Sequence, residues 1–290
     1  MRDGATFRFE YRGEDGELTY VLTPQTGSPS DLTAEWIGRG GMFRPMVGGG
    51  IRPVAAADGA FEQQLVDAAL AGDTVACRSR WSAGGATGEA PYRYRLWGKT
   101  LVIDVLAGGG AIGEVRFGEA AGLPNPRLVP LPYLSHRSAP RPCVLVAGTG
   151  ERPLFLMGNA DWYLSNASEL FAENRCRRRP RPLQGGGSRY LPKTDGQRNP
   201  VAERLFLTVS PQFEGVLPNL PNRSRRGSRS PGRSCGGRTA HRTRDTDRKY
   251  WRSVWRKGMR EILVTDHETG WRDGGESFTF RTRPAPGKGR

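Results

Sequence analysis

The sequence predicts a mainly β chain, built as an antiparallel β-sandwich that is followed by the start of an α/β domain. Short strand-like segments recur about every ten residues over residues 5–172, with glycines and prolines between them, and this spacing favours a sandwich over a parallel sheet. The 290 residues include 40 glycines and 22 prolines, so much of the chain must be turn and loop. From residue 245 the pattern changes to one helix and one short apolar strand.

Most segments of the predicted sandwich alternate apolar and polar residues, as half-buried strands do. Residues 6–11 and 18–23 form a predicted hairpin around a glycine-containing turn. The other predicted strands cover residues 32–37, 74–81, 92–97, 100–106, 112–117, 128–134, 143–147, 153–157 and 205–209. Residues 39–50 are predicted as a glycine-rich loop, and residues 63–70 are compatible with a short helix.

Three regions follow from this pattern. A β-sandwich domain is predicted over residues 5–215, interrupted by a basic insert at 174–189. Residues 216–244 are predicted as a disordered arginine-rich linker, because 222–244 lack every large apolar side chain and cannot offset the entropy of ordering. Residues 245–290 begin with a helix, capped by Asp245 or Thr246, and continue into an apolar strand at 261–265. No closing element follows, so we expect an α/β domain that has been cut off.

Two arginine-rich stretches carry nearly all of the net charge of +15. Residues 175–181 hold five arginines and residues 223–244 hold eight, with no acid in either, which leaves +2 for the rest of the chain. Three interpretations stay open. The stretches are a solvated linker, an arm that binds nucleic acid non-specifically through phosphate contacts, or a part of the gene read out of frame. The arginines that such an arm would use include Arg223, Arg225, Arg226 and Arg229.

One cluster of reactive residues follows the apolar strand at 261–265. Asp266 and Glu268 are the candidate catalytic carboxylates, with His267 between them as a candidate substrate-binding residue. Reactive groups of barrels and open α/β sheets lie at this end of a strand, and glycoside hydrolysis uses two carboxyl groups. Neighbouring carboxylates on one strand are too close to act as acid and base together, so we expect one of them to contact substrate. The alternative is that they cap the next turn.

Two further groups of residues are candidates for binding a sugar. Trp271, Arg272 and Asp273 follow in a loop that would cover the same strand end. Asp161 and Trp162 precede Tyr163 in the sandwich, where the two rings could form a stacking platform. The alternative is that both rings fill the sandwich core.

The arrangement resembles large bacterial glycoside-hydrolase-type proteins, on the segments 95–118, 158–163 and 250–268. In those proteins an N-terminal β-supersandwich is joined to a (β/α)₈ catalytic barrel. The resemblance implies an antiparallel β-sandwich followed by the truncated start of an α/β barrel domain. It also implies a fragment of a glycosidase, inactive as written, whose parent hydrolyses glycosidic bonds of a carbohydrate substrate.

The rival function is a carbohydrate-binding or arginine-rich nucleic-acid-binding protein without catalysis. The four cysteines show no CxxC spacing, so no metal and no cofactor is predicted. No apolar run is long enough to span a membrane and no signal peptide is visible. The chain opens directly into strand-like sequence, which suggests a missing natural start, and the compartment stays open.

Overall fold

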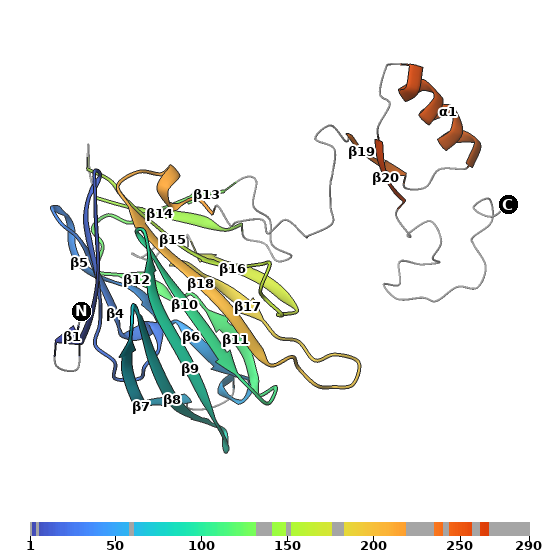
Figure 1. Cartoon of the computed structure of the whole chain (residues 1–290). Coiled ribbons are helices and arrows are strands. Elements are labelled where there is room, and N and C mark those ends of the chain that lie inside the picture. Colours follow the sequence, from blue (N-terminus) through green and yellow to red (C-terminus); the bar gives the residue numbers. More distant parts are fainter. Residues whose placement is uncertain are drawn as a thin grey trace. The chain divides into compact units, whose positions relative to one another are not determined.

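The structure is a computed structural model that describes residues 2–3, 6–57, 61–131, 141–148, 152–175, 183–218, 235–239, 244–256 and 262–266. The chain divides into two compact units, Met1–Pro221 and Asn222–Arg290. The first unit is built from antiparallel sheets (Figure 1). The prediction of a mainly β chain with a sandwich-like architecture is confirmed.

The described strands of the first unit form three sheets. A six-stranded sheet has the order β1 (Arg2–Asp3), β2 (Thr6–Gly13), β3 (Gly16–Leu22), β4 (Leu32–Trp36), β5 (Arg39–Val47) and β12 (Glu119–Ala121). An eight-stranded sheet has the order β13 (Arg127–Pro130), β14 (Cys143–Ala147), β15 (Leu154–Ala160), β18 (Val201–Ser210), β10 (Thr100–Ala107), β9 (Ala86–Trp97), β8 (Thr74–Ala83) and β7 (Phe61–Ala71). A four-stranded sheet has the order β16 (Glu169–Arg175), β17 (Leu183–Arg189), β11 (Ile112–Arg116) and β6 (Gly50–Pro53). The described connections contain three short 3₁₀ helices: η1 (Pro29–Asp31), η2 (Val54–Ala57) and η3 (Glu214–Val216).

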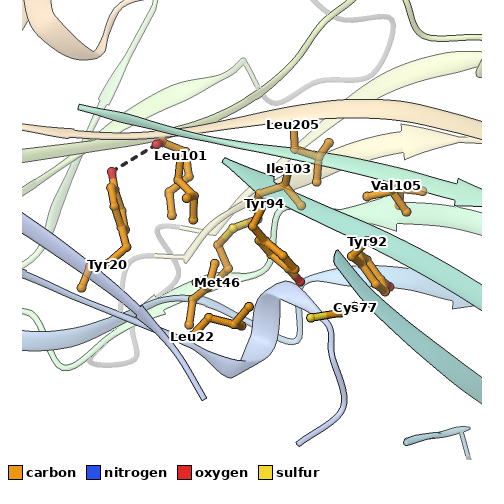
Figure 2. Close-up of a cluster of buried hydrophobic side chains, with 14 of the residues drawn as sticks. Tyr20, Leu22, Met46, Cys77, Tyr92, Tyr94, Leu101, Ile103, Val105 and Leu205 are labelled. Carbon is orange, nitrogen blue, oxygen red and sulfur yellow. Dashed lines mark hydrogen bonds between the residues drawn. The ribbon is translucent and has the colours of Figure 1, made fainter. Parts of the chain in front are cut away.

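The inner faces of the three sheets share one large hydrophobic core, to which most strands contribute alternate side chains. A smaller cluster consists of Leu131, Val144, Met157 and Val216. The bulkiest fully buried members of the large core include Trp36, Tyr20, Tyr92, Tyr94, Tyr190, Phe7 and Phe43. Figure 2 shows Tyr20 and Leu22 of β3 facing Leu101 and Ile103 of β10 across this core. The opposite face of the eight-stranded sheet therefore points away from this core.

Buried tyrosine hydroxyls connect separate segments of the fold within the core. Tyr20 of β3 donates to the carbonyl oxygens of Lys99 and Leu207, at 2.9 Å and 3.2 Å. Tyr94 of β9 donates to the Gly27 carbonyl at 2.9 Å. Each hydroxyl is therefore satisfied away from water. The Tyr20 bonds link two sheets, whereas the Tyr94 bond links β9 to the loop between β3 and β4.

The Tyr20→Phe substitution is expected to lower the free energy of unfolding by about 1–2 kcal/mol, because it removes a buried donor without changing the ring. Urea denaturation followed by fluorescence measures the loss. Thr6→Val is the matched control, since that hydroxyl makes an exposed contact at 3.4 Å with Thr23, and it is expected to cost less than about 0.5 kcal/mol. Equal losses for the two variants would contradict this role of Tyr20.

Two segments of the sandwich differ from their prediction. Residues 39–50, predicted as a loop, form β5 and the start of β6, because Phe43 and Met46 pack into the core while glycines with positive φ supply the turns. Residues 63–70 belong to the strand β7 instead of a helix. A tight hairpin with β8 pairs nearly every residue of β7, and this pairing outweighs a weak local preference for helix.

The predicted basic insert at 174–189 contains a strand of the fold. Residues 183–189 form β17, which pairs with both β16 and β11. Three consecutive glycines, which carry no side chain, occupy residues 185–187 of this strand. Residues 176–182 of the insert lie outside the described residues.

The second unit contains a β–α–β arrangement among its described residues. The predicted helix is α1 (Arg244–Arg256), and the predicted strand is β20 (Ile262–Asp266). Residues 235–239, which we assigned to a disordered linker, form β19 (Cys235–Thr239) and pair in parallel with β20. A helix that connects two parallel strands is the repeating unit of α/β folds. No α/β barrel is visible in the described part of the chain.

Candidate functional site

The predicted catalytic region lies almost wholly outside the described residues. Asp266 is the last residue of β20, and only its backbone is described. His267, Glu268, Trp271, Arg272 and Asp273 fall in the range 267–290 and have no described structure. The same holds for Arg223, Arg225, Arg226 and Arg229. The assignment of these residues to catalysis, sugar binding or nucleic-acid binding therefore stays a prediction.

Asp161 and Trp162 lie in a tight turn directly after β15. The Asp161 N–H donates to the Arg204 carbonyl at 2.8 Å, and its carboxylate accepts from the Tyr163 N–H at 3.1 Å. The carboxylate therefore organises the turn. Tyr163 is 54% exposed and its ring lies 6.0 Å from that of the half-buried Trp162. The alternative that both rings fill the core is wrong for Tyr163.

The outer face of the eight-stranded sheet brings together a larger set of functional side chains. Across β9, β10, β18 and β15, which lie side by side in Figure 1, the residues that alternate with core residues form rows. The first row is Trp97, Thr100, Thr208 and Met157; the second is Arg95, Val102, Phe206 and Asn159; the third is Arg93, Asp104 and Arg204. We call this surface the outer-face groove; it holds two separate cavities, one lined by residues of the first and second rows and one by residues of the third.

The first cavity, of about 340 Å³, forms the aromatic end of the outer-face groove. Its lining residues are Trp97, Gly98, Lys99, Thr100, Met157, Asn159, Phe206, Thr208, Gly215, Val216, Leu217 and Pro218. Trp97 is 58% exposed, and its ring centroid lies 6.4 Å from that of Phe206. Residues 215–218, which include part of η3, border the cavity. An exposed indole beside a concave surface is a ready contact for a flat ligand.

Polar groups line the same cavity. The hydroxyls of Thr100 and Thr208 lie 2.8 Å apart. Asn159 is 6% exposed, and its amide Nδ2 has no hydrogen-bond partner among the residues that the structure describes. A buried amide without a partner is rare in folded proteins and calls for an explanation.

The second cavity, of about 330 Å³, forms the basic end of the outer-face groove. Its lining residues are Pro91, Arg93, Asp104, Leu106, Leu164, Ala202, Glu203 and Arg204. Asp104 accepts from Arg95 at 2.8 Å and from Arg204 at 2.5 Å, and its carboxylate raises the pKa of Arg204. Arg93 is exposed and forms no ion pair within the described part of the chain. Leu164 brings the turn that contains Asp161 and Trp162 to this cavity.

A third cavity, of about 410 Å³ on the four-stranded sheet, is also lined by arginines. Here Arg116 and Arg189 both bind Glu114, at 2.7 Å and 2.9 Å. Burial raises the pKa of Glu114, but the two guanidinium groups outweigh it and lower the pKa overall. Arg116 also binds a second glutamate, Glu173, and Arg189 binds Glu169. The charges of Arg116 and Arg189 are thus compensated by glutamates. The other two arginines of this cavity, Arg52 and Arg198, donate to the carbonyl oxygens of Ala56 and Tyr190, and we assign the cavity no ligand.

The sequence reasoning missed Trp97, Asn159 and Phe206. The signal for Trp97 was present in residues 92–97, where Tyr, Tyr and Leu alternate with Arg, Arg and Trp. One face of that strand had to be apolar core, which leaves Trp97 with the two arginines on the other face. Phe206 and Asn159 join it only through strand pairing between distant segments, which a local pattern does not contain.

No three His, Cys, Asp or Glu side chains in the described ranges lie close enough to hold a metal ion. The described residues also contain no helix that is long and apolar enough to cross a membrane. Comparison with protein-family models, with curated proteins and with solved structures gives no match.

Proposed function

We propose that the β-sandwich binds carbohydrate in the outer-face groove, as the sugar-binding part of a carbohydrate-active protein. The observation that carries this proposal is the exposed ring of Trp97 beside a cavity with polar groups from three strands. A sugar ring has an apolar C–H face and a rim of hydroxyls. It therefore needs an aromatic surface together with hydrogen-bonding side chains, as this end of the groove supplies.

Asn159 supports a ligand with hydroxyl oxygens. An unpaired buried amide costs about 1–3 kcal/mol. A sugar hydroxyl in the cavity would accept from Nδ2 and recover that cost, whereas a purely apolar ligand would not. The hydroxyl pair of Thr100 and Thr208 offers both donors and acceptors along the neighbouring row.

The groove itself favours binding over hydrolysis. Glycoside hydrolysis uses two carboxyl groups that lie about 5–10 Å apart across the sugar. Asp104 is the carboxylate in the third row of the groove, and both of its oxygens bind guanidinium groups. We therefore place any hydrolysis in a catalytic α/β barrel that begins with the β–α–β unit of residues 235–266, where one of Asp266 and Glu268 would contact substrate and the partner carboxylate would come from a later strand. This assignment rests on the resemblance to glycoside-hydrolase-type proteins.

The Trp97→Ala substitution tests the proposal. The full chain is screened on a glycan array, and the bound glycans are titrated by calorimetry. Loss of the stacking surface is expected to weaken binding at least about tenfold, equivalent to about 1.4 kcal/mol. The melting temperature is expected to stay within about 1 °C, because the indole is mostly exposed.

Tyr163→Ala is the matched control, because it removes an aromatic ring of similar exposure from the neighbouring turn. It is expected to leave the affinity within about twofold. If Tyr163→Ala abolishes binding and Trp97→Ala does not, the sugar binds at the predicted Asp161–Trp162 platform and the groove is the wrong site. If no glycan binds the wild-type chain, the proposed function is wrong.

A further inference from the structure

We infer that the glycan bound in the outer-face groove is acidic, and that Arg93 binds a uronic acid carboxylate at the basic end. This inference rests on the proposed function and specifies its ligand. It separates the groove into two parts: the Trp97 cavity takes a sugar ring by stacking, and the Arg93 cavity takes a charged group.

The charge balance at the basic end leaves one arginine without a partner. The third row and its neighbour contain Arg93, Arg95 and Arg204 against the carboxylate of Asp104. The other carboxylate that lines the cavity, Glu203, accepts from the hydroxyls of Ser165, Ser188 and Tyr190. Arg95 and Arg204 both bind that carboxylate. Arg93 lines the cavity without an ion pair in the described ranges. Its planar guanidinium presents five N–H donors and matches a carboxylate in a bidentate arrangement.

The Asp104 network gives the basic end a fixed geometry. Asp104 binds the guanidinium groups of both Arg95 and Arg204, so these two side chains are held in place at its carboxylate. Their remaining N–H groups keep the surroundings of Arg93 positively charged. An incoming carboxylate therefore meets a preformed cationic site, whereas a second cation would be repelled.

The distance along the strands fits an oligosaccharide. Trp97 and Arg93 lie four residues apart on β9, which corresponds to about 13 Å in a strand. That span exceeds a single sugar ring, so one ligand in contact with both residues must contain several sugars. The ligand is thus an acidic oligosaccharide or a segment of an acidic polysaccharide.

A single-stranded nucleic acid is the other polymer that combines flat rings with negative charge. Such strands bind along successive aromatic platforms and a continuous basic track, because every nucleotide carries a base and a phosphate. The groove offers one mostly exposed ring, Trp97, since Phe206 is only partly exposed. It also offers one arginine, Arg93, that has no ion pair within the described part of the chain. One exposed ring and one such arginine fit a polymer that carries occasional charges better than a polymer with a charge at every unit.

The test compares acidic and neutral forms of the same oligosaccharide on the full chain. Oligogalacturonate, oligomannuronate and oligoglucuronate are each titrated beside their carboxyl-reduced, neutral counterparts. At least one acidic form is expected to bind about tenfold more tightly than its reduced form, and Arg93→Gln is expected to remove that advantage.

Arg127→Gln is the matched control. Arg127 is an exposed arginine on β13, at the far edge of the same sheet, and its replacement changes the net charge equally. Both variants keep the arginine-rich stretches 175–181 and 223–244, so non-specific attraction of polyanions is the same in each. Arg127→Gln is expected to keep the tenfold preference.

The outcomes separate this inference from the proposed function. If neutral glycans bind with loss on Trp97→Ala, but no acidic form is preferred, the inference is wrong and the proposed function stands. If Arg93→Gln and Arg127→Gln weaken the acidic form equally, the preference comes from overall charge and the inference is wrong. If an oligo(dT) strand binds in a Trp97-dependent manner while no oligosaccharide does, both the inference and the proposed function are wrong.

Discussion

Replacing Gly187 by alanine is expected to destabilise the sandwich by more than about 4 kcal/mol. Gly187 lies at the centre of β17, between β16 and β11. A Cβ atom there would stand 1.9 Å from the carbonyl oxygen of Val115 and 2.9 Å from its carbonyl carbon. These are backbone atoms of a paired strand, so no side-chain rotation relieves the contact. Movement of β17 away from β11 would disturb its pairing with β16 instead.

Urea denaturation of Gly187→Ala measures this loss against Gly109→Ala. Gly109 also has a positive φ, of +81°, but a Cβ atom at this position would have no neighbouring atom within 4 Å. Only local strain is then added, about 1 kcal/mol. Similar stabilities for the two variants would contradict the packing of β17 against β11, and with it the assignment of residues 183–189 to the sandwich.

Replacing Glu203 by leucine is expected to lower the free energy of unfolding by about 3 kcal/mol or more. Glu203 of β18 is 3% exposed, and its carboxylate accepts from Ser165 at 2.8 Å, from Ser188 at 2.9 Å and from the Tyr190 hydroxyl. Leucine fills a similar volume but leaves the buried hydroxyls of Ser188 and Tyr190 and the half-buried hydroxyl of Ser165 without this acceptor. Glu203→Gln keeps an acceptor oxygen and is expected to cost about 1 kcal/mol. Equal losses for leucine and glutamine would show that only shape matters at this position.

The difference in stability between Glu203→Gln and wild type is expected to depend on pH, and its direction follows from the pKa shift of Glu203. Burial raises the pKa of Glu203, and the nearby Asp161 charge adds to this. A carboxyl whose pKa is raised on folding stabilises the fold below its unfolded pKa, about 4.3, and loses that contribution as the pH rises through its folded pKa. The glutamine variant should therefore gain stability relative to wild type as the pH rises from 4 to 8.

The contributions of Asp15 and Glu114 to stability depend on pH in the opposite direction, because their pKa values are lowered. Burial raises the pKa of Asp15, but hydrogen bonds from Lys99 and Tyr11 outweigh it and lower the pKa overall. Such groups contribute stability above their unfolded pKa and lose it as the pH falls. The total stability therefore mixes both signs, whereas the difference between wild type and Glu203→Gln isolates one group. A pH-independent difference between those two proteins would contradict the role of Glu203.

Local alternation was sufficient to predict most strands of the sandwich. Residues 6–11, 74–81 and 100–106 are predicted as strands because their apolar side chains recur at every second position, and each contributes to the core. Residues 183–189 gave no such signal, since their sequence is LQGGGSR. That strand forms because glycines permit close approach to its neighbours, and its hydrogen bonds depend on partners far away in sequence.

The candidate site was harder to predict for a related reason. Asp161 and Trp162 were predicted to bind a sugar because they are neighbours in sequence. The outer-face groove is instead assembled from β9, β10, β15 and β18, which are distant in sequence. Asn159 and Trp97 are separated by 62 positions in the chain and line the same cavity. Sequence patterns indicate which face of a strand is exposed, whereas the sheet order that joins those faces requires the fold.

A crystal structure of the chain with its tightest-binding oligosaccharide tests the central claim most directly. We expect a sugar ring against the indole of Trp97 and a sugar hydroxyl within hydrogen-bond distance of the Asn159 amide. A sugar bound at the turn of Trp162 and Tyr163, or on another sheet, with the cavity beside Trp97 unoccupied, would contradict it.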